Sequence, residues 1–145
     1  MKVTQTKYLI TALCIVLLTS CNFALLPPYS REVSAQIENT AKSVDRFYLD
    51  MLEKTDTAGN GRAYANFADG YIDIEVELNS LYTKNRIRPL NKASTRNCEI
   101  ALQRWREYKE EHKQKNTISN GLIAYKRQYM SDLFYTIQVS EEFKQ

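Results

Sequence analysis

One pattern dominates the sequence after residue 30: apolar residues recur every three or four positions through four segments of about 25 residues each. The segments are 31–55, 62–88, 91–115 and 119–143. This spacing places apolar side chains on one face of an α-helix, and 25 residues form a helix of roughly 38 Å. Short connections between helices of equal length favour antiparallel neighbours. The sequence therefore predicts an all-α domain over residues 31–145, an up-down-up-down antiparallel four-helix bundle.

The first segment has a recognisable start and end. Ser30 is a suitable N-cap residue, and TDTAGNG at residues 55–61 is rich in turn-forming residues. We expect a helix between these two signals. Its predicted apolar face is Val33, Ile37, Ala41, Val44, Phe47, Tyr48, Met51 and Leu52.

The second segment allows two interpretations. IDIEVEL, residues 72–78, alternates apolar and acidic residues as a half-buried strand does. Helical spacing nevertheless continues through the same residues, and no turn signal precedes Pro89, which would end a helix. We therefore predict a helix whose apolar face is widened by Ile72 and Val76. The other residues of this face are Tyr64, Phe67, Tyr71, Ile74, Leu78, Leu81 and Tyr82.

The last two segments carry apolar stripes rich in aromatic residues, which are more often packing than a ligand site. The third stripe is Cys98, Ala101, Leu102, Trp105 and Tyr108. The fourth is Leu122, Tyr125, Tyr129, Leu133, Ile137 and Phe143, with Ile123, Met130 and Phe134 beside it.

The N-terminus has the order of a secretory signal peptide. Lys2 and Lys7 precede eleven uncharged residues at 8–18, and the small residues Thr19 and Ser20 follow. Eleven residues are too few for a membrane span, which needs about 20. We therefore expect residues 1–20 to be removed.

Leu18-Thr19-Ser20-Cys21 resembles the lipobox of bacterial lipoproteins: a branched apolar residue, two small residues and a cysteine. The resemblance implies that Cys21 is lipidated and becomes the first mature residue, and that residues 21–30 form a short lipidated tether. Cys14 follows bulky Leu13 and would be lost with the signal. Because Asn22 is not aspartate, the same resemblance favours the outer membrane over the inner membrane of the cell envelope.

Removal of the signal changes the charge and the cysteine count. The chain has 20 basic and 17 acidic residues, and without Lys2 and Lys7 the mature net charge is +1. This balance gives no reason to expect nucleic acid as a partner. If Cys21 is acylated, Cys98 has no partner for an intramolecular disulfide, and we interpret it as a small buried apolar residue.

Few residues suit catalysis or metal binding. His112 is the only histidine, which excludes multi-histidine metal sites, and no Glu-x-x-His pair is present for a di-iron centre. We therefore expect neither an enzyme nor a metal site, and no cofactor. One alternative stays open: in this topology Met51 and His112 lie at the same end of the bundle and could ligate a haem, although a histidine there is more often solvated and cationic.

One basic run remains, KNRIRPLNKASTR at residues 84–96, which contains no acidic residue. The topology brings it to the end of the bundle nearest the lipid, where its charges could face an anionic membrane surface. The alternative is an ordinary solvated loop. The charged residues of the run are Lys84, Arg86, Arg88, Lys92 and Arg96.

Two functions follow from these observations. The preferred one is an envelope lipoprotein, held to the membrane by lipid on Cys21, whose helical domain is a non-enzymatic protein-binding or structural module with an envelope protein as partner. The alternative is a carrier of a small ligand or haem inside the bundle.

Overall fold

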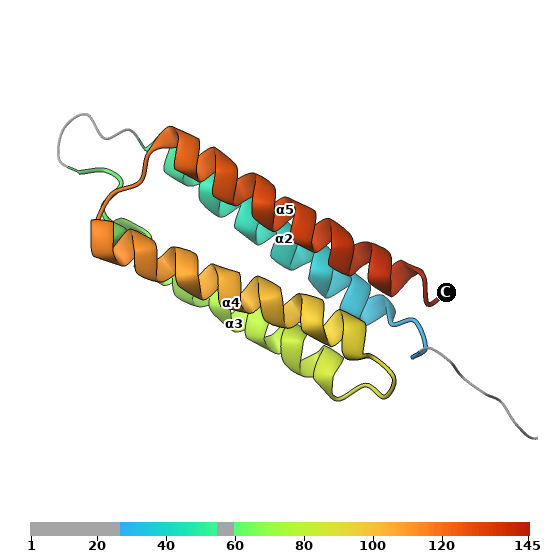
Figure 1. Ribbon diagram of the computed structural model, residues 1–145. Helices are drawn as coiled ribbons and strands as arrows, with labels where there is room; N and C mark the ends of the chain where they lie inside the picture. The colour runs from blue at the N-terminus through green and yellow to red at the C-terminus, as the bar shows by residue number, and fades with distance from the viewer. Residues whose placement is uncertain (1–26, 55–59) are drawn as a thin grey trace, which may run out of the picture.

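The computed structural model describes residues 27–54 and 60–145. Within these ranges the chain is helical and contains no strand, and the four long helices form the predicted four-helix bundle (Figure 1). The elements are α2 (Arg31–Glu53), the short 3₁₀-helix η1 (Tyr64–Asn66), α3 (Ala68–Arg86), α4 (Lys92–Lys115) and α5 (Asn120–Glu142). Residues 1–20, Cys21 and most of the expected tether lie outside the described residues.

Helices α2 and α5 begin at serine N-caps. The Ser30 hydroxyl accepts a hydrogen bond from the backbone N–H of Val33, as the sequence predicts, and Ser119 accepts one from Leu122, each at 3.3 Å. Each contact satisfies one N–H group that the first helical turn leaves free. At the other end of α4, Asn116 adopts a left-handed conformation with φ 52° and stops the helix.

The second helix is shorter than predicted. The expected helix over 62–88 is η1 followed by α3, which begins only at Ala68. The Arg62 side chain donates hydrogen bonds to carbonyl groups of α2, and the Asn66 side chain donates to the carbonyls of Asn60 and Gly61. These contacts hold residues 60–63 in a turn, and only the short 3₁₀-helix η1 precedes α3. Residues 72–78 lie inside α3, so the strand interpretation is wrong.

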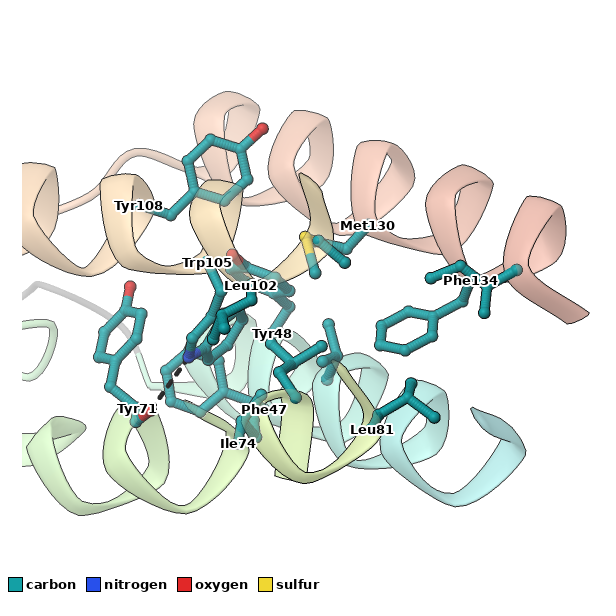
Figure 2. Close-up of a cluster of buried hydrophobic side chains, with 14 of the residues drawn as sticks. Phe47, Tyr48, Tyr71, Ile74, Leu81, Leu102, Trp105, Tyr108, Met130 and Phe134 are labelled. Atoms are coloured by element: carbon teal, nitrogen blue, oxygen red, sulfur yellow. Dashed lines mark hydrogen bonds between the residues drawn. The ribbon is translucent and has the colours of Figure 1, made fainter. Parts of the chain in front are cut away.

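The helices pack as a four-cornered bundle in which α2 contacts α3 and α5, and α4 contacts the same two helices (Figure 1). Aromatic side chains fill its middle (Figure 2). Phe47 makes edge-to-face contacts with Tyr71 and Trp105 at ring-centre distances of 4.6 and 5.2 Å. The Trp105 indole N–H donates to the Tyr71 carbonyl at 3.0 Å, which joins α4 to α3. A Cβ at Gly70 would lie 2.9 Å from Phe47, so this contact needs glycine.

The apolar faces of α3 and α5 differ from the prediction. Ile72 and Val76 do not widen the buried face of α3, because their side chains are 51% and 63% exposed. Tyr125 on α5 and Phe143, the residue that follows α5, are exposed as well. The buried residues of α5 are Ile123, Lys126, Met130, Phe134, Ile137 and Glu141.

These α5 residues follow the three-and-four spacing of a core stripe, but charged residues occupy two of the positions. A search for apolar residues alone therefore shifts the predicted stripe toward its exposed neighbours. The two charges, Lys126 and Glu141, lie near opposite ends of α5.

Candidate functional site

The two ends of the bundle are the candidate sites. The proximal end contains the start of α2, the α3–α4 connection at 87–91 and the end of α5 (Figure 1). The distal end contains the end of α2, η1 and the α4–α5 connection at 116–119. Each end buries charged or titratable side chains that a helical core does not require.

At the distal end, both ring nitrogens of His112 are hydrogen-bonded. Nε2 lies 2.8 Å from the Arg62 carbonyl oxygen, and Nδ1 lies 3.2 Å from the Tyr71 hydroxyl. A carbonyl only accepts, so Nε2 carries the proton and Nδ1 accepts from Tyr71. The residue is 1% exposed, and burial lowers its pKa; the hydrogen bond to Arg62 opposes this and the nearby Lys126 charge adds to it. His112 is thus a neutral, buried side chain.

This geometry does not fit the haem hypothesis. Met51 and His112 do lie at the same end, and the Arg62 guanidinium and carbonyl contact both residues. An axial ligand needs a free ring nitrogen on the metal side, however, and both nitrogens of His112 have protein partners. The expectation of a solvated, cationic histidine is also wrong, because the ring is buried.

Arg62 closes the distal end. Its Nε donates to the carbonyls of Met51 and Lys54 at 3.0 and 2.8 Å. Its two terminal nitrogens lie 3.3 Å from the Ile118 carbonyl and 3.4 Å from the Leu52 carbonyl. The last turn of α2 has no basic residue of its own, so this distant arginine satisfies the free carbonyls that a helix end leaves. Sequence analysis missed this role because Arg62 lies outside every apolar stripe.

Lys126 is the second buried cation of the distal end. Its Nζ lies 2.7 Å from a Glu111 carboxylate oxygen and 4.6 Å from the centre of the Tyr108 ring. The Glu111 contact is close but falls outside hydrogen-bond geometry, so charge attraction and the ring hold the ammonium. Burial lowers the pKa of Lys126 and Glu111 opposes that change. The Tyr48 hydroxyl nearby is buried and has no hydrogen-bond partner among the residues that the structure describes.

The described residues hold no group of three metal-ligating His, Cys, Asp or Glu side chains. Cys98 is buried, as its interpretation as a small apolar residue predicts, and forms no disulfide within residues 27–54 and 60–145. Burial raises the pKa of its thiol to about 12; the Lys144 charge lowers it slightly and the Glu141 charge raises it slightly. The Asn85 amide nitrogen lies 3.4 Å from its sulfur. At neutral pH the thiol is protonated and enclosed, which suits packing and not redox chemistry.

At the proximal end, Arg88 has a different role from the one predicted. Its two terminal nitrogens each lie 2.9 Å from one oxygen of Glu141, whose side chain is 1% exposed. The guanidinium also donates to the Pro28 carbonyl. A charge held in this pair is neutralised inside the protein, so Arg88 is not a membrane-facing charge. A bidentate pair of this kind is strong because both hydrogen bonds are charge-assisted.

The Glu141 carboxylate accepts further hydrogen bonds. The Lys144 ammonium and the Ser30 backbone N–H also donate to its carboxylate, the latter at 2.8 Å. Burial alone raises the carboxyl pKa, but these contacts and Arg88 outweigh it, and the net pKa is lowered. The carboxylate thus ties the tether side of α2 to the end of α5 and to the α3–α4 connection.

The other basic residues of 84–96 are partly compensated. Lys84 pairs with Glu32, and Arg96 pairs with Glu99, each at 2.6 Å. Arg86 and Lys92 have no carboxylate partner among residues 27–54 and 60–145. The structure therefore reduces the predicted five-residue basic patch to two uncompensated charges.

Three large apolar side chains are exposed beside these charges, and the sequence analysis did not identify them as a group. They are Ile87, Leu90 and Phe143, at 75%, 60% and 79% exposure. Leu90 and Phe143 line one hollow of about 270 Å³, whose edge includes Pro27. Leu90 has φ 59°, a left-handed conformation that strains a residue with a side chain.

A groove of about 560 Å³ lies between α2 and α5, on the side of the bundle. Ile37, Val44 and Phe134 contribute apolar surface to it, and Tyr135 is 72% exposed at this groove. Its charged lining residues are partly paired: Lys42 with Glu38, and Arg127 with Asp45, both at 2.5 Å.

None of the described helices combines the length and the apolar content that crossing a membrane requires. Comparison of the chain with models of known protein families, with characterised proteins and with solved structures found no match.

Proposed function

We propose that the protein is a lipid-anchored protein of the bacterial cell envelope whose helical bundle is a non-enzymatic protein-binding or structural module. The observation that carries this proposal is the lipobox-like sequence Leu18-Thr19-Ser20-Cys21, after which a helical domain follows closely. Two or more acyl chains on one residue would hold the protein stably at a membrane, whereas one would not. Asn22 favours the outer membrane.

The short distance from Cys21 to the bundle supports this arrangement. Five residues lie between Cys21 and Pro27, where the described chain begins, and the six steps from Cys21 to Pro27 reach at most about 20 Å. The proximal end would therefore stay close to the lipid surface, and the distal end would point away from it.

The chemistry of the bundle supports a module without catalysis. The reactive side chains that a small enzyme could use are engaged in structure: His112 through both nitrogens, Cys98 by burial and Glu141 by three donors. The groove between α2 and α5 suits contact with apolar side chains of an envelope protein. No observation favours the carrier of a small ligand or haem.

The anchor is tested in cells by palmitate labelling and fractionation. Wild-type protein should incorporate label and sediment with outer membranes, and Cys21→Ala should do neither, while Cys14→Ala should behave as wild type. Continued labelling of Cys21→Ala would refute the assignment of Cys21. Labelled protein in the inner membrane would refute only the outer-membrane assignment.

The binding role is tested with a photo-crosslinking amino acid at Tyr135, in the groove, and at Gln103, an exposed residue of α4 away from it. Attachment of a discrete envelope protein from position 135 but not from position 103 would support the protein-binding module. Equal crosslinking from both positions, or none from either, would contradict the groove as its contact surface.

A further inference from the structure

The proximal end exposes apolar surface that the fold does not explain. Ile87 and Leu90 lie in the α3–α4 connection, and Phe143 directly follows α5. Both segments lie at the proximal end (Figure 1). Leu90 and Phe143 line the same hollow although they are far apart in the sequence. Apolar side chains gathered on one end of a small domain indicate a binding surface more often than single scattered ones do.

Leu90 is the most informative of the three. A left-handed φ of 59° favours glycine, and a leucine there is strained. Burial often compensates such strain, but this side chain is 60% exposed. Neither the backbone conformation nor packing within the bundle accounts for leucine at this position. An apolar contact outside the bundle would account for it.

The charges around this surface indicate what it contacts. Arg86 and Lys92 flank the α3–α4 connection and have no carboxylate partner in the part of the chain that the structure describes. Both lie with Leu90 around a second hollow. Among the acidic residues at this end, Glu32, Glu99 and Glu141 are each paired with a cation. Glu142 has no cation partner among the described residues, but it lines the groove between α2 and α5, where the Gln138 amide donates to it. Apolar side chains bordered by uncompensated cations match an anionic lipid surface, which offers acyl chains beneath phosphate headgroups.

We propose that the proximal end docks on the surface of an anionic membrane, with Ile87, Leu90 and Phe143 entering the interfacial region. Arg86 and Lys92 contact the headgroups. This inference rests on the proposed lipid anchor, because Pro27 at the edge of the hollow lies six residues from Cys21. The acyl chains keep the protein at the membrane, and the docked end fixes how the bundle stands on it.

The test uses tryptophan fluorescence of the full acylated protein in vesicles that contain brominated lipids. Phe143→Trp places a probe at the proposed contact, and Tyr125→Trp places one on an exposed aromatic position of the same helix at its distal end. Trp105 is fully buried and adds the same background to both. Brominated phosphatidylglycerol should quench the Phe143→Trp protein and leave the Tyr125→Trp protein unchanged.

Charge reversal sharpens the test. Arg86→Glu with Lys92→Glu removes two favourable charges, each of which contributes about a fivefold preference for an anionic surface. The ratio of docked to undocked Phe143→Trp protein should therefore fall by at least about 25-fold, which is seen as a decrease in quenching, and circular dichroism should stay unchanged. Vesicles of phosphatidylcholine alone should also give little quenching.

Other occupants of this surface give different results. If residues 22–26 or a second copy of the chain cover it, the Phe143→Trp emission is blue-shifted before vesicles are added and does not respond to them, which overturns the proposal. Equal quenching of both probes overturns it too, because the bundle would then lie flat or tumble.

Failure of the anchor is recognised separately. The mass of the purified protein shows whether Cys21 carries acyl chains before vesicles are added. If it does not, a maleimide lipid attached to Cys21 in a Cys14→Ala background supplies the tether, since Cys98 is buried. Quenching of the Phe143→Trp probe then decides docking independently of the proposed function.

Discussion

The two ends of the bundle bury charge in different ways. At the distal end, Arg62 is surrounded by backbone carbonyls and His112 is neutral. At the proximal end, Glu141 is buried among cationic partners, Arg88 and Lys144. Apart from the Lys126–Glu111 pair, the distal contacts satisfy the polar groups of a chain turn, whereas the proximal ion pairs join three separate segments.

This difference separates a structural end from an end suited to contact. At the distal end, the polar groups form hydrogen bonds with one another and with backbone carbonyls of the bundle. At the proximal end the ion pairs hold the α3–α4 connection in place, and the connection in turn holds Leu90 in a strained, exposed position. A fixed framework beneath exposed apolar side chains is what a docking surface requires.

The largest effect is expected from Glu141→Ala. The substitution leaves Arg88 and Lys144 beside each other without their carboxylate, and breaking a buried pair costs about 3–5 kcal/mol of unfolding free energy. Denaturant unfolding followed by circular dichroism measures it. The matched control is Glu142→Ala, an exposed neighbour, which should change stability by less than about 0.5 kcal/mol. Equal effects of the two substitutions would contradict the role of Glu141.

Arg62→Ala should come next, at about 3 kcal/mol, because carbonyls at the end of α2 lose their donors. Water can reach some of these groups, so the loss should stay below that of Glu141→Ala. Arg62→Lys should recover only part of the stability, since one ammonium group cannot reach carbonyls on both α2 and the α4–α5 connection. Full recovery with lysine would show that only the positive charge matters at the distal end.

The four helices could be predicted because apolar spacing records which residues face a core. Helices α2, α4 and α5 end within two residues of their predicted bounds. The start of α3 could not be predicted, since it depends on the hydrogen bonds of Arg62 to carbonyls of residues far away in the sequence. The apolar spacing of a helix continues through the segment before Ala68, but the hydrogen bonds of Arg62 prevent the α-helix from starting earlier.

The polar members of the core explain the other errors. Lys126 and Glu141 occupy core positions of α5 because Glu111 and Arg88, on other segments, are placed to pair with them. The same pairing removes Arg88 from the predicted basic patch. Charged residues look solvent-exposed in a sequence, and only the fold shows which ones have partners. The exposed trio Ile87, Leu90 and Phe143 was missed because Phe143 is far from the other two in the sequence and was assigned to the apolar stripe of the last helix.

Lowering the pH should weaken the distal end first. The pKa of His112 is lower in the folded protein than its ordinary value of 6.5, so the unfolded chain binds a proton more readily. The histidine contribution is complete above pH 6.5 and falls as the pH drops from 6.5 toward the folded pKa. The pKa of Glu141 is also lowered, from 4.5, so the proximal pair should persist until the pH falls below that value.

Hydrogen exchange distinguishes the two ends. Between pH 6.5 and about 5, after correction for intrinsic rates, amides near His112 should lose protection while those near Ser30 keep theirs. His112→Gln should remove this pH dependence. Simultaneous loss at both ends would indicate that the bundle unfolds only as one unit.

The smallest effect is expected from Leu90→Gly, and its sign is the informative part. Glycine relieves the left-handed strain of leucine, which is about 1–2 kcal/mol, but it also makes the unfolded chain more flexible, which costs about 0.4–1 kcal/mol. The strain relief is larger, and little packing is lost because the side chain is 60% exposed.

The Leu90→Gly variant should therefore be more stable by about 0.5 kcal/mol in denaturant unfolding. In the Phe143→Trp background, the same substitution should decrease the quenching of the tryptophan by anionic brominated vesicles. A residue that weakens the fold and strengthens contact with the membrane belongs to the contact surface. A destabilised variant would show instead that Leu90 serves packing within the bundle.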